Sequence, residues 1–321
     1  MHPVVSIQIP TYNQQQFIKR TVESCLMQDY PNLEINVADD GSSDGTAEIM
    51  KGFLDDPRVK YYRNEKNIGR VANYHKALYE YATGEWAINL DGDDYFIDPG
   101  FISKAIRLIL SLKDKDICIY QGNHDIDKIK TVLPESEMID RQTLCVKGTD
   151  YFINYPKILH FQHCATVYNR AKALTLNFYS FPGLFTDFNS MAKLFLKGDI
   201  LVSSDKVAYW NQHAQNESNN LNSNTISTEI RSIAQIAAHA LSVFPEKTVK
   251  KWRIKMKGYL LSLYVDMQKG SRLNRQALKQ LIINFSPDAV HFRQLAKALL
   301  VLMGFRNNIY SQGNRKKNDI R

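Results

Sequence analysis

The sequence predicts an α/β fold in which a mostly parallel sheet is covered by helices on both faces. Over the first 120 residues, short apolar segments alternate with segments of helical periodicity. This alternation is typical of parallel strands joined by crossover helices. From residue 226 to about 304 the pattern is almost entirely helical, which predicts a C-terminal helical region.

The N-terminal elements are expected as three strand–helix pairs followed by a fourth strand. The strands are expected at 4–9, 33–38, 59–62 and 85–90, and the helices at 14–28, 44–54 and 70–83. Gly84 directly follows the third helix, a position where glycine commonly ends a helix. The later pattern is looser, with strands expected at 116–120 and 164–168, a helix at 187–196 and a loop at 211–225.

The chain length of 321 residues allows one large domain or two units. We expect an N-terminal domain at 1–225, a basic helical region at 226–306 and a polar tail at 307–321. The start of the chain lacks the basic segment of a signal peptide, and no uninterrupted apolar stretch reaches the about 18 residues of a spanning helix. The four cysteines form no C-x-x-C pair, which favours reduced thiols in a cytoplasmic protein over a zinc or redox site.

Polar residues follow three of the expected strands. These segments are Pro10–Asn13, Asp39–Ser42 and Asp91–Asp94. In open parallel sheets, ligands bind outside the carboxyl ends of the strands. The sequence therefore predicts a ligand site where these three segments meet.

The Asp91-Gly92-Asp93-Asp94 segment suggests a cation site. In an extended segment Asp91 and Asp93 point the same way, and Gly92 leaves room for a close ligand. Clustered carboxylates repel one another unless a positive group joins them. Mn²⁺ or Mg²⁺ suits such oxygen ligands and commonly binds substrate phosphates as well. A solvent-exposed turn is the alternative interpretation, because aspartate and glycine also form ordinary turns.

Other strand-end residues suit a nucleotide. A carboxylate of Asp39 or Asp40 could accept a hydrogen bond from a base or a ribose hydroxyl, or could simply cap the next helix. Tyr12 could stack on a nucleobase or pack at the end of the sheet. Arg70 could pair with a diphosphate, because a guanidinium matches phosphate oxygens, or could lie on the surface.

Together these motifs resemble glycosyltransferase family 2. They are P-T-Y-N at 10–13, D-D-G-S-S-D-G-T at 39–46, N-x-G at 67–69 with Asn73 following, and G-E-W-A-I-N-L-D-G-D-D at 84–94. The resemblance covers about the first 100 residues in order and spacing. It implies a GT-A nucleotide-sugar-binding fold, a nucleotide-diphosphate-sugar donor and inversion at the anomeric carbon.

The resemblance also implies roles for individual residues. Tyr12 and Asp40 would contact the base, and Asp39 would support the nucleotide pocket. Asp93 and Asp94 would lie at the ribose, the metal and the diphosphate. The other motif residues expected at the nucleotide-sugar site are Pro10, Asn13, Asn67, Gly69, Arg70, Asn73, Asp91 and Gly92.

Two later residues are assigned by the same resemblance. The family has an acidic pair that opens a helix and supplies the catalytic base. Thr186 replaces the first acid here, and Asp187 remains as the expected general base. Its alternative role is to stabilise a helix N-terminus. Tyr209–His213 resembles the segment that closes over the donor, which places His213 at the diphosphate or metal unless it is a plain loop histidine.

Positive charge is concentrated late in the chain. Residues 245–321 contain 17 lysines and arginines but four acids, whereas the remainder is net acidic because the total net charge is +8. A basic run at 247–257 precedes an amphipathic pattern at 289–303 with Arg293 and Lys297 on its polar side. This combination favours an anionic membrane surface, and packing against the N-terminal domain is the alternative. No nucleic-acid-binding motif accompanies the basic residues, so no nucleic-acid partner is expected.

The expected protein is an inverting hexosyltransferase of polysaccharide or lipopolysaccharide synthesis. It would move a sugar from a UDP-sugar to a hydroxyl of a glycan or lipid-linked glycan, with Asp187 as base and Mn²⁺ or Mg²⁺ held by Asp93, Asp94 and His213. It would be cytoplasmic and peripheral on the inner face of the cell membrane. The alternatives are a nucleotide-sugar-binding protein with impaired catalysis, suggested by Thr186, and a nucleic-acid-binding protein that uses the basic tail.

Overall fold

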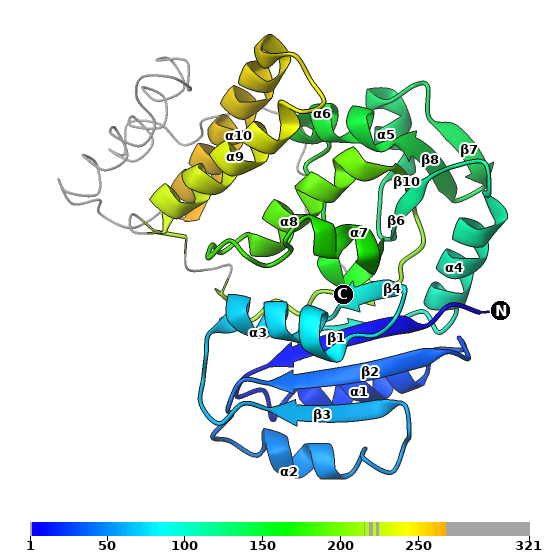
Figure 1. Cartoon of the computed structure of the whole chain (residues 1–321), viewed down its shortest axis with the longest axis vertical. Coiled ribbons are helices and arrows are strands. Elements are labelled where there is room, and N and C mark those ends of the chain that lie inside the picture. The colour runs from blue at the N-terminus through cyan, green and yellow to red at the C-terminus, as the bar shows by residue number, and fades with distance from the viewer. Residues whose placement is uncertain (1, 215, 218–220, 223–224, 268–321) are drawn as a thin grey trace. The chain divides into compact units, whose positions relative to one another are not determined.

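The computed structural model describes residues 2–214, 216–217, 221–222 and 225–267 (Figure 1). Contacts divide the chain into two compact units, Met1–Ala214 and Gln215–Arg321. The first unit is an α/β structure built on a nine-stranded sheet within the described residues. The second unit contains two described helices.

The central sheet has the strand order β3-β2-β1-β4-β9-β6-β10-β8-β7. Its strands are β1 (Val5–Thr11), β2 (Leu33–Asp39), β3 (Val59–Arg63), β4 (Trp86–Asn89), β6 (Ile117–Gln121), β7 (Glu137–Asp140), β8 (Thr143–Lys147), β9 (Thr166–Asn169) and β10 (Asp199–Ser203). Strands β8 and β9 run against the other strands. The other described strands of this sheet share one direction, so the predicted mostly parallel sheet is confirmed.

A second, two-stranded sheet pairs β5 (Tyr95–Phe96) with β11 (Ala208–Tyr209). The helices of the first unit are α1 (Ile18–Leu26), α2 (Thr46–Lys51), α3 (Arg70–Lys76), α4 (Phe101–Ser111), α5 (Ile126–Val132), α6 (Gly148–Ile158), α7 (Arg170–Thr175) and α8 (Thr186–Leu194). Shorter helical turns are the π-helical turn η1 (Ala77–Tyr81) and the 3₁₀ turns η2 (His163–Ala165) and η3 (Phe195–Lys197).

One face of β1 and β2 forms the hydrophobic core. Alternate residues of a strand point to opposite faces, and Val5, Ile7 and Ile9 share the face that packs against Ile18 and Val22 of α1. All five side chains are fully buried. The burial of this face explains why residues 4–9 read as a strand in the sequence.

The opposite face of the same strands is buried but polar. Ser6 and Gln8 of β1 lie beside Glu34 and Asn36 of β2. The Ser6 hydroxyl donates to Glu34, and the Thr83 hydroxyl donates to the other Glu34 oxygen at 2.8 Å. These hydrogen bonds connect the end of the expected third helix to the sheet.

Gly84 has a different structural role from the expected one. The helix predicted at 70–83 is α3 followed by η1, and it ends at Tyr81. A left-handed helix cap has a positive φ angle. Gly41 and Gly69 have a positive φ, but Gly84 does not. A Cβ atom at Gly84 would lie 2.6 Å from the Ser6 Oγ and 2.7 Å from the Val4 carbonyl oxygen. Glycine is therefore required at this position by close approach to β1.

Replacing Gly84 with alanine is expected to destabilise the protein by about 1–3 kcal/mol, because the added methyl group overpacks the backbone of β1. Thermal unfolding measures this loss. Gly52→Ala is the matched control, since its Cβ would meet only the Ile49 carbonyl oxygen at an ordinary 3.5 Å. Equal melting temperatures for the two variants would contradict the close-approach explanation.

The described part of the second unit consists of α9 (Ile226–Ala240) and α10 (Glu246–Met267), which pack against each other. The basic run at 247–257 lies on α10. Among the described residues, no helix is long and apolar enough to cross a membrane. The amphipathic pattern at 289–303 and the expected tail at 307–321 lie outside the described residues.

Candidate active site

The site lies at the carboxyl ends of β1, β2 and β4. These strands are parallel neighbours, and backbone hydrogen bonds extend their pairing into the polar segments that follow. The Asp40 amide donates to the Thr11 carbonyl at 2.9 Å, and the Gly92 amide donates to the Pro10 carbonyl at 3.1 Å. The three polar segments predicted to meet are therefore brought together at one edge of the sheet.

The acidic turn at 91–94 packs closely on β1 and α1. A Cβ atom at Gly92 would lie 2.3 Å from the Gln14 Oε1 and 2.7 Å from the Thr11 Oγ1. The Thr21 hydroxyl of α1 lies 2.9 Å from the Gly92 carbonyl oxygen and 2.7 Å from that of Asp94. This packing leaves no room for a side chain at position 92 and fixes the path of the acidic turn.

Asp94 is the most buried carboxylate of the turn. Its Oδ1 accepts a hydrogen bond from the Asn211 amide at 3.0 Å. Within the described residues, its buried Oδ2 has no hydrogen-bond partner. Burial, followed by repulsion from Asp91 and Asp93, raises the pKa of Asp94 well above its usual range. A carboxylate in this environment fits a bound cation, which would offset the repulsion.

Asp93 faces the segment that follows β11. Its Oδ2 lies 2.8 Å from the His213 Nε2, and the His213 ring stacks on Phe17 with centroids 4.8 Å apart. Burial and the charge of Asp91 raise the pKa of Asp93, whereas His213 opposes that rise. The structure therefore brings two of the three residues expected to bind metal, Asp93 and His213, into direct contact.

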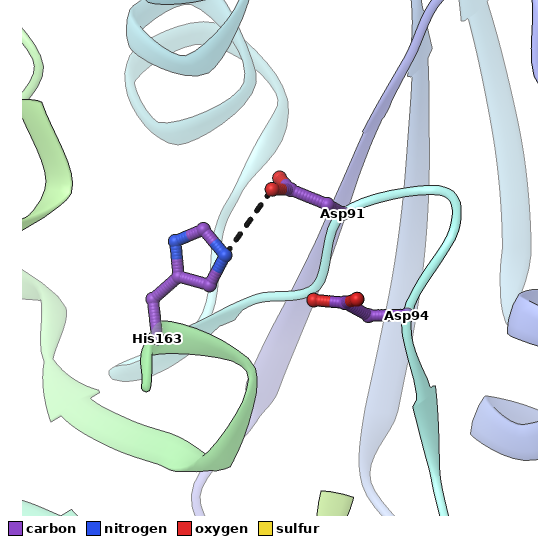
Figure 2. A group of neighbouring side chains, drawn as sticks. All are labelled: Asp91, Asp94 and His163. Carbon is purple, nitrogen blue, oxygen red and sulfur yellow. Dashed lines mark ion pairs between the residues drawn. The ribbon is translucent and has the colours of Figure 1, made fainter. Parts of the chain in front are cut away.

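A histidine that the sequence did not suggest contacts the acidic turn. Figure 2 shows the His163 ring between the ribbon of η2 and Asp91. The His163 Nε2 is 3.2 Å from the Asp91 Oδ2. Asp91, Asp94 and His163 each offer one possible ligand atom, and these three atoms lie within 4.8 Å of one another. This trio is a second arrangement of side chains that could hold a cation.

Asp187 lies across His163 from the acidic turn. It is in the first turn of α8, and its Oδ2 is 3.5 Å from the His163 Nδ1. Asp91 of the acidic turn and Asp187 of α8 thus flank a single imidazole ring. Burial alone would lower the pKa of His163, but Asp91, Asp187 and Asp94 raise it to about 9.

Three neighbouring residues contact the Asp39 carboxylate. Its Oδ1 accepts a hydrogen bond from the Ser42 amide at 2.8 Å, its Oδ2 accepts one from the Tyr61 hydroxyl, and Arg63 lies 3.8 Å away. Burial and the bond to Asp39 raise the pKa of Tyr61 above its usual range. These contacts fit the expected supporting role of Asp39.

Asp40 holds the loop that leads into α3. Its Oδ1 accepts hydrogen bonds from the Ile68 amide at 2.8 Å and the Asn64 side chain at 3.0 Å, and its Oδ2 accepts one from the Gly69 amide at 2.9 Å. Gly69 has a φ of +93°, which favours glycine, and its amide also donates to the Asn67 side chain at 2.9 Å.

Asn73 and Arg70 tie α3 to its surroundings. The Asn73 side chain donates to the Ala38 carbonyl at 2.7 Å. The Arg70 guanidinium donates to the carbonyls of Gly183 and Leu184 at 3.0 and 2.9 Å, so it reaches the loop before α8. In this structure Arg70 therefore connects the start of α3 to the loop before α8, the helix that carries Asp187.

The residues at the end of β1 and just after it have different environments. Pro10 is buried within β1. Asn13 has a φ of +53° and accepts a hydrogen bond from the Ser43 amide at 2.8 Å. Tyr12 is 47% exposed, so its ring is accessible to a ligand.

The mostly parallel sheet with an acidic turn at its edge fits the expected class of GT-A glycosyltransferases. Residues 6–175 match the family model described as "Glycosyl transferase family 2". Because this match covers more than half of the chain, the protein belongs to glycosyl transferase family 2. The predicted family and enzyme class are confirmed.

Known proteins are similar to this chain over part of their length. It is 35% identical over 127 residues to a chondroitin synthase of Pasteurella multocida, which corresponds to 39% of this chain and 13% of that protein. It is 32% identical over 128 residues to a Campylobacter jejuni GalNAc(5)-diNAcBac-PP-undecaprenol beta-1,3-glucosyltransferase, with 39% and 40% covered. The chain thus matches less than half of the length of these relatives.

Solved structures confirm the predicted GT-A fold. S. aureus TarS 1-349 in complex with UDP-GlcNAc has a TM-score of 0.68 at 18% identity, covering 94% of this chain and 88% of that one. A Pyrobaculum calidifontis mannosyltransferase in complex with GDP-Man and Mn²⁺ has a TM-score of 0.55 at 15% identity, covering 96% and 83%. At these identities the likeness concerns the fold alone.

Proposed function

We propose that this protein transfers a sugar, with inversion, from a UDP-sugar to a hydroxyl of a glycan or lipid-linked glycan. The observation that carries this proposal is the placement of Asp187 opposite the acidic turn, with His163 between them. An inverting transfer needs a base on one side of the anomeric carbon and a leaving diphosphate on the other. In this proposal Asp187 supplies the base, and the acidic turn on the other side of His163 supports the leaving diphosphate.

Asp93 and Asp94, together with His213, would hold Mn²⁺ or Mg²⁺ on the donor side. The buried, unpartnered oxygen of Asp94 and the contact between Asp93 and His213 support this part of the proposal. A bound divalent cation offsets the negative charge that develops on a leaving diphosphate. The Pyrobaculum mannosyltransferase of similar fold binds Mn²⁺ together with its nucleotide-sugar, which also supports a divalent cation here.

Asp187 acts as the general base. The acceptor oxygen forms a bond to the anomeric carbon while its proton passes to the Asp187 carboxylate. The bond between the anomeric carbon and the diphosphate oxygen breaks, and its electron pair leaves with the nucleoside diphosphate. A general base of this kind contributes about 10²- to 10⁴-fold to a rate.

The nucleoside side of the donor would lie over the loops after β1 and β2. The exposed ring of Tyr12 is available for stacking on a base. Asp39 and Asp40 support that surface through their hydrogen bonds to the loops around them, with Asn13, Asn67, Gly69 and Asn73 shaping it. A uridine nucleotide is the favoured donor, and the complex of TarS with UDP-GlcNAc supports this choice.

The relatives and the charge of the chain support a proposal for the acceptor and the cellular location. The Campylobacter relative is named for an undecaprenol-linked acceptor, which supports a lipid-linked glycan here. We assign catalysis to residues 1–225 and membrane-surface binding to the basic helical region at 226–306, with 307–321 as a tail. The basic run on α10 supports peripheral binding to the inner, anionic face of a membrane.

A thermal-shift screen tests the donor proposal. The protein is heated with UDP-, GDP- and dTDP-sugars, each with and without Mn²⁺. A ligand that binds only the native state raises stability by mass action, by about 2.7 kcal/mol at a hundred times its Kd. We expect a rise in Tm with a UDP-sugar that depends on Mn²⁺. Stabilisation by GDP-sugars alone, or by none of the donors, would contradict the proposal.

A further inference from the structure

His163 stands between two carboxylates that come from distant parts of the chain. Its Nε2 is 3.2 Å from the Asp91 Oδ2, and its Nδ1 is 3.5 Å from the Asp187 Oδ2. The His163 side chain is only 12% exposed. The ring therefore occupies the space between the acidic turn and α8 rather than solvent.

The position of the ring is set by the backbone on both sides of it. His163 begins η2, which leads directly into β9. Because β9 is antiparallel to β4, its start lies at the sheet edge where β4 ends and the acidic turn begins. The Tyr74 hydroxyl, which donates to the Asp91 Oδ1, holds that carboxylate from the other side.

The two ring nitrogens suit a bridge. The Nε2 faces the Asp91 carboxylate and the Nδ1 faces the Asp187 carboxylate. The buried Nδ1 has no hydrogen-bond partner among the described residues, so the Asp187 oxygen 3.5 Å away is the group that it can engage.

We propose that His163 is a positioning residue that holds the Asp187 carboxylate at a set place relative to Asp91. This role rests on the proposed function, in which Asp187 accepts the acceptor proton. A base contributes fully only within hydrogen-bond reach of that proton, and a misplacement of 1 Å can cost about 100-fold in rate. His163 transfers no proton to or from the sugar in this proposal.

Substitution of His163 separates its two contacts. The asparagine amide reaches the place of Nδ1, so His163→Asn retains the group that faces Asp187. The longer glutamine amide reaches the place of Nε2, so His163→Gln retains the group that faces Asp91. His163→Ala removes both and leaves space for free imidazole. His75→Ala is the matched control, because His75 lies on α3 and stacks on Tyr79 outside the site.

The assay measures release of UDP from the UDP-sugar selected by the thermal-shift screen, with polyprenyl-diphosphate-linked oligosaccharides as acceptors. We expect kcat to fall about 100-fold in His163→Ala, with the donor KM and the Kd of UDP changed less than about threefold. His163→Asn should retain at least about ten times the kcat of the alanine variant, and His163→Gln should not. Free imidazole should restore part of the kcat of His163→Ala.

Three results would overturn this role. The first is an unchanged kcat in His163→Ala. The second is a loss that imidazole and asparagine both fail to relieve, accompanied by weaker UDP binding, which would indicate a merely structural residue. The third is a shift in the Mn²⁺ concentration needed for activity, which would make His163 a metal ligand. A wild-type protein that transfers no sugar would instead overturn the proposed function. The three results above concern only the His163 variants of an active enzyme, so the two failures are distinguishable.

Discussion

Asp187→Asn is expected to lower kcat by about 10²- to 10⁴-fold while the Kd for UDP stays near that of the wild type. Asparagine keeps the shape of the side chain but does not accept the acceptor proton at neutral pH. The Asp187 carboxylate is separated from Asp91 by the His163 ring, so its loss leaves the donor side of the site in place. Steady-state UDP release and titration of UDP by calorimetry measure the two quantities.

Asp127→Asn is the matched control for this substitution. Asp127 is an exposed aspartate in the first turn of α5, as Asp187 is in the first turn of α8. If Asp187 served only to stabilise its helix N-terminus, both variants would lose about 0.3–1 kcal/mol of stability and neither would lose turnover. Retained kcat in Asp187→Asn would therefore exclude Asp187 as the base.

The parts of the fold predicted well from the sequence are those governed by local pattern. Strands β1, β2 and β4 carry alternate core residues such as Ile7, Ile35 and Ile88, and each leads into a polar segment. A parallel sheet places the carboxyl ends of its strands at one edge, so the meeting of these polar segments followed from the expectation of a parallel sheet.

His163 was missed for a topological reason. Functional residues were expected after strands, whereas His163 precedes β9. Because β9 is inserted antiparallel between β4 and β6, its start rather than its end reaches the site. Nothing in the local pattern of residues 164–168 indicated strand direction, since direction depends on pairing with strands that are distant in the sequence.

Strands β7, β8 and β10 were not predicted, although β6 and β9 were. The strands β7 and β8 form an antiparallel pair at the edge of the sheet, and β10 joins β6 to β8. Edge strands such as Glu137–Asp140 are partly exposed and lack a continuous apolar run. Their stability depends on pairing across the sheet, which a window of a few residues does not reveal.

The polar motif residues also gained roles that the motif alone did not indicate. Both oxygens of Asp40 accept hydrogen bonds from the loop before α3, which includes Gly69. Arg70 donates to the backbone before α8 rather than standing open at the surface. These residues therefore link the loop before α3 to the helix of the proposed base, and substituting them should affect the placement of both.

The proposed metal site gives the second large expected effect. Removal of divalent cations with EDTA should abolish transfer, because the leaving diphosphate then has no cation to offset its charge. Addition of Mn²⁺ should restore transfer. His213→Ala should raise the Mn²⁺ concentration for half-maximal activity by at least about tenfold, the lower end of the loss seen when only an outer-shell partner of a metal is removed. Activity against Mn²⁺ concentration measures this shift.

The same titration distinguishes the two cation arrangements at the acidic turn. In the proposed arrangement, Asp93 and His213 bind the cation with Asp94, and the contact between Asp93 and His213 supports it. In the other, the ligands are Asp91, Asp94 and His163. Asp93→Asn should then act like His213→Ala in the first arrangement and leave the Mn²⁺ dependence unchanged in the second. A shift in His163→Ala but not in His213→Ala would move the cation toward α8, where it would occupy the space between the acidic turn and Asp187.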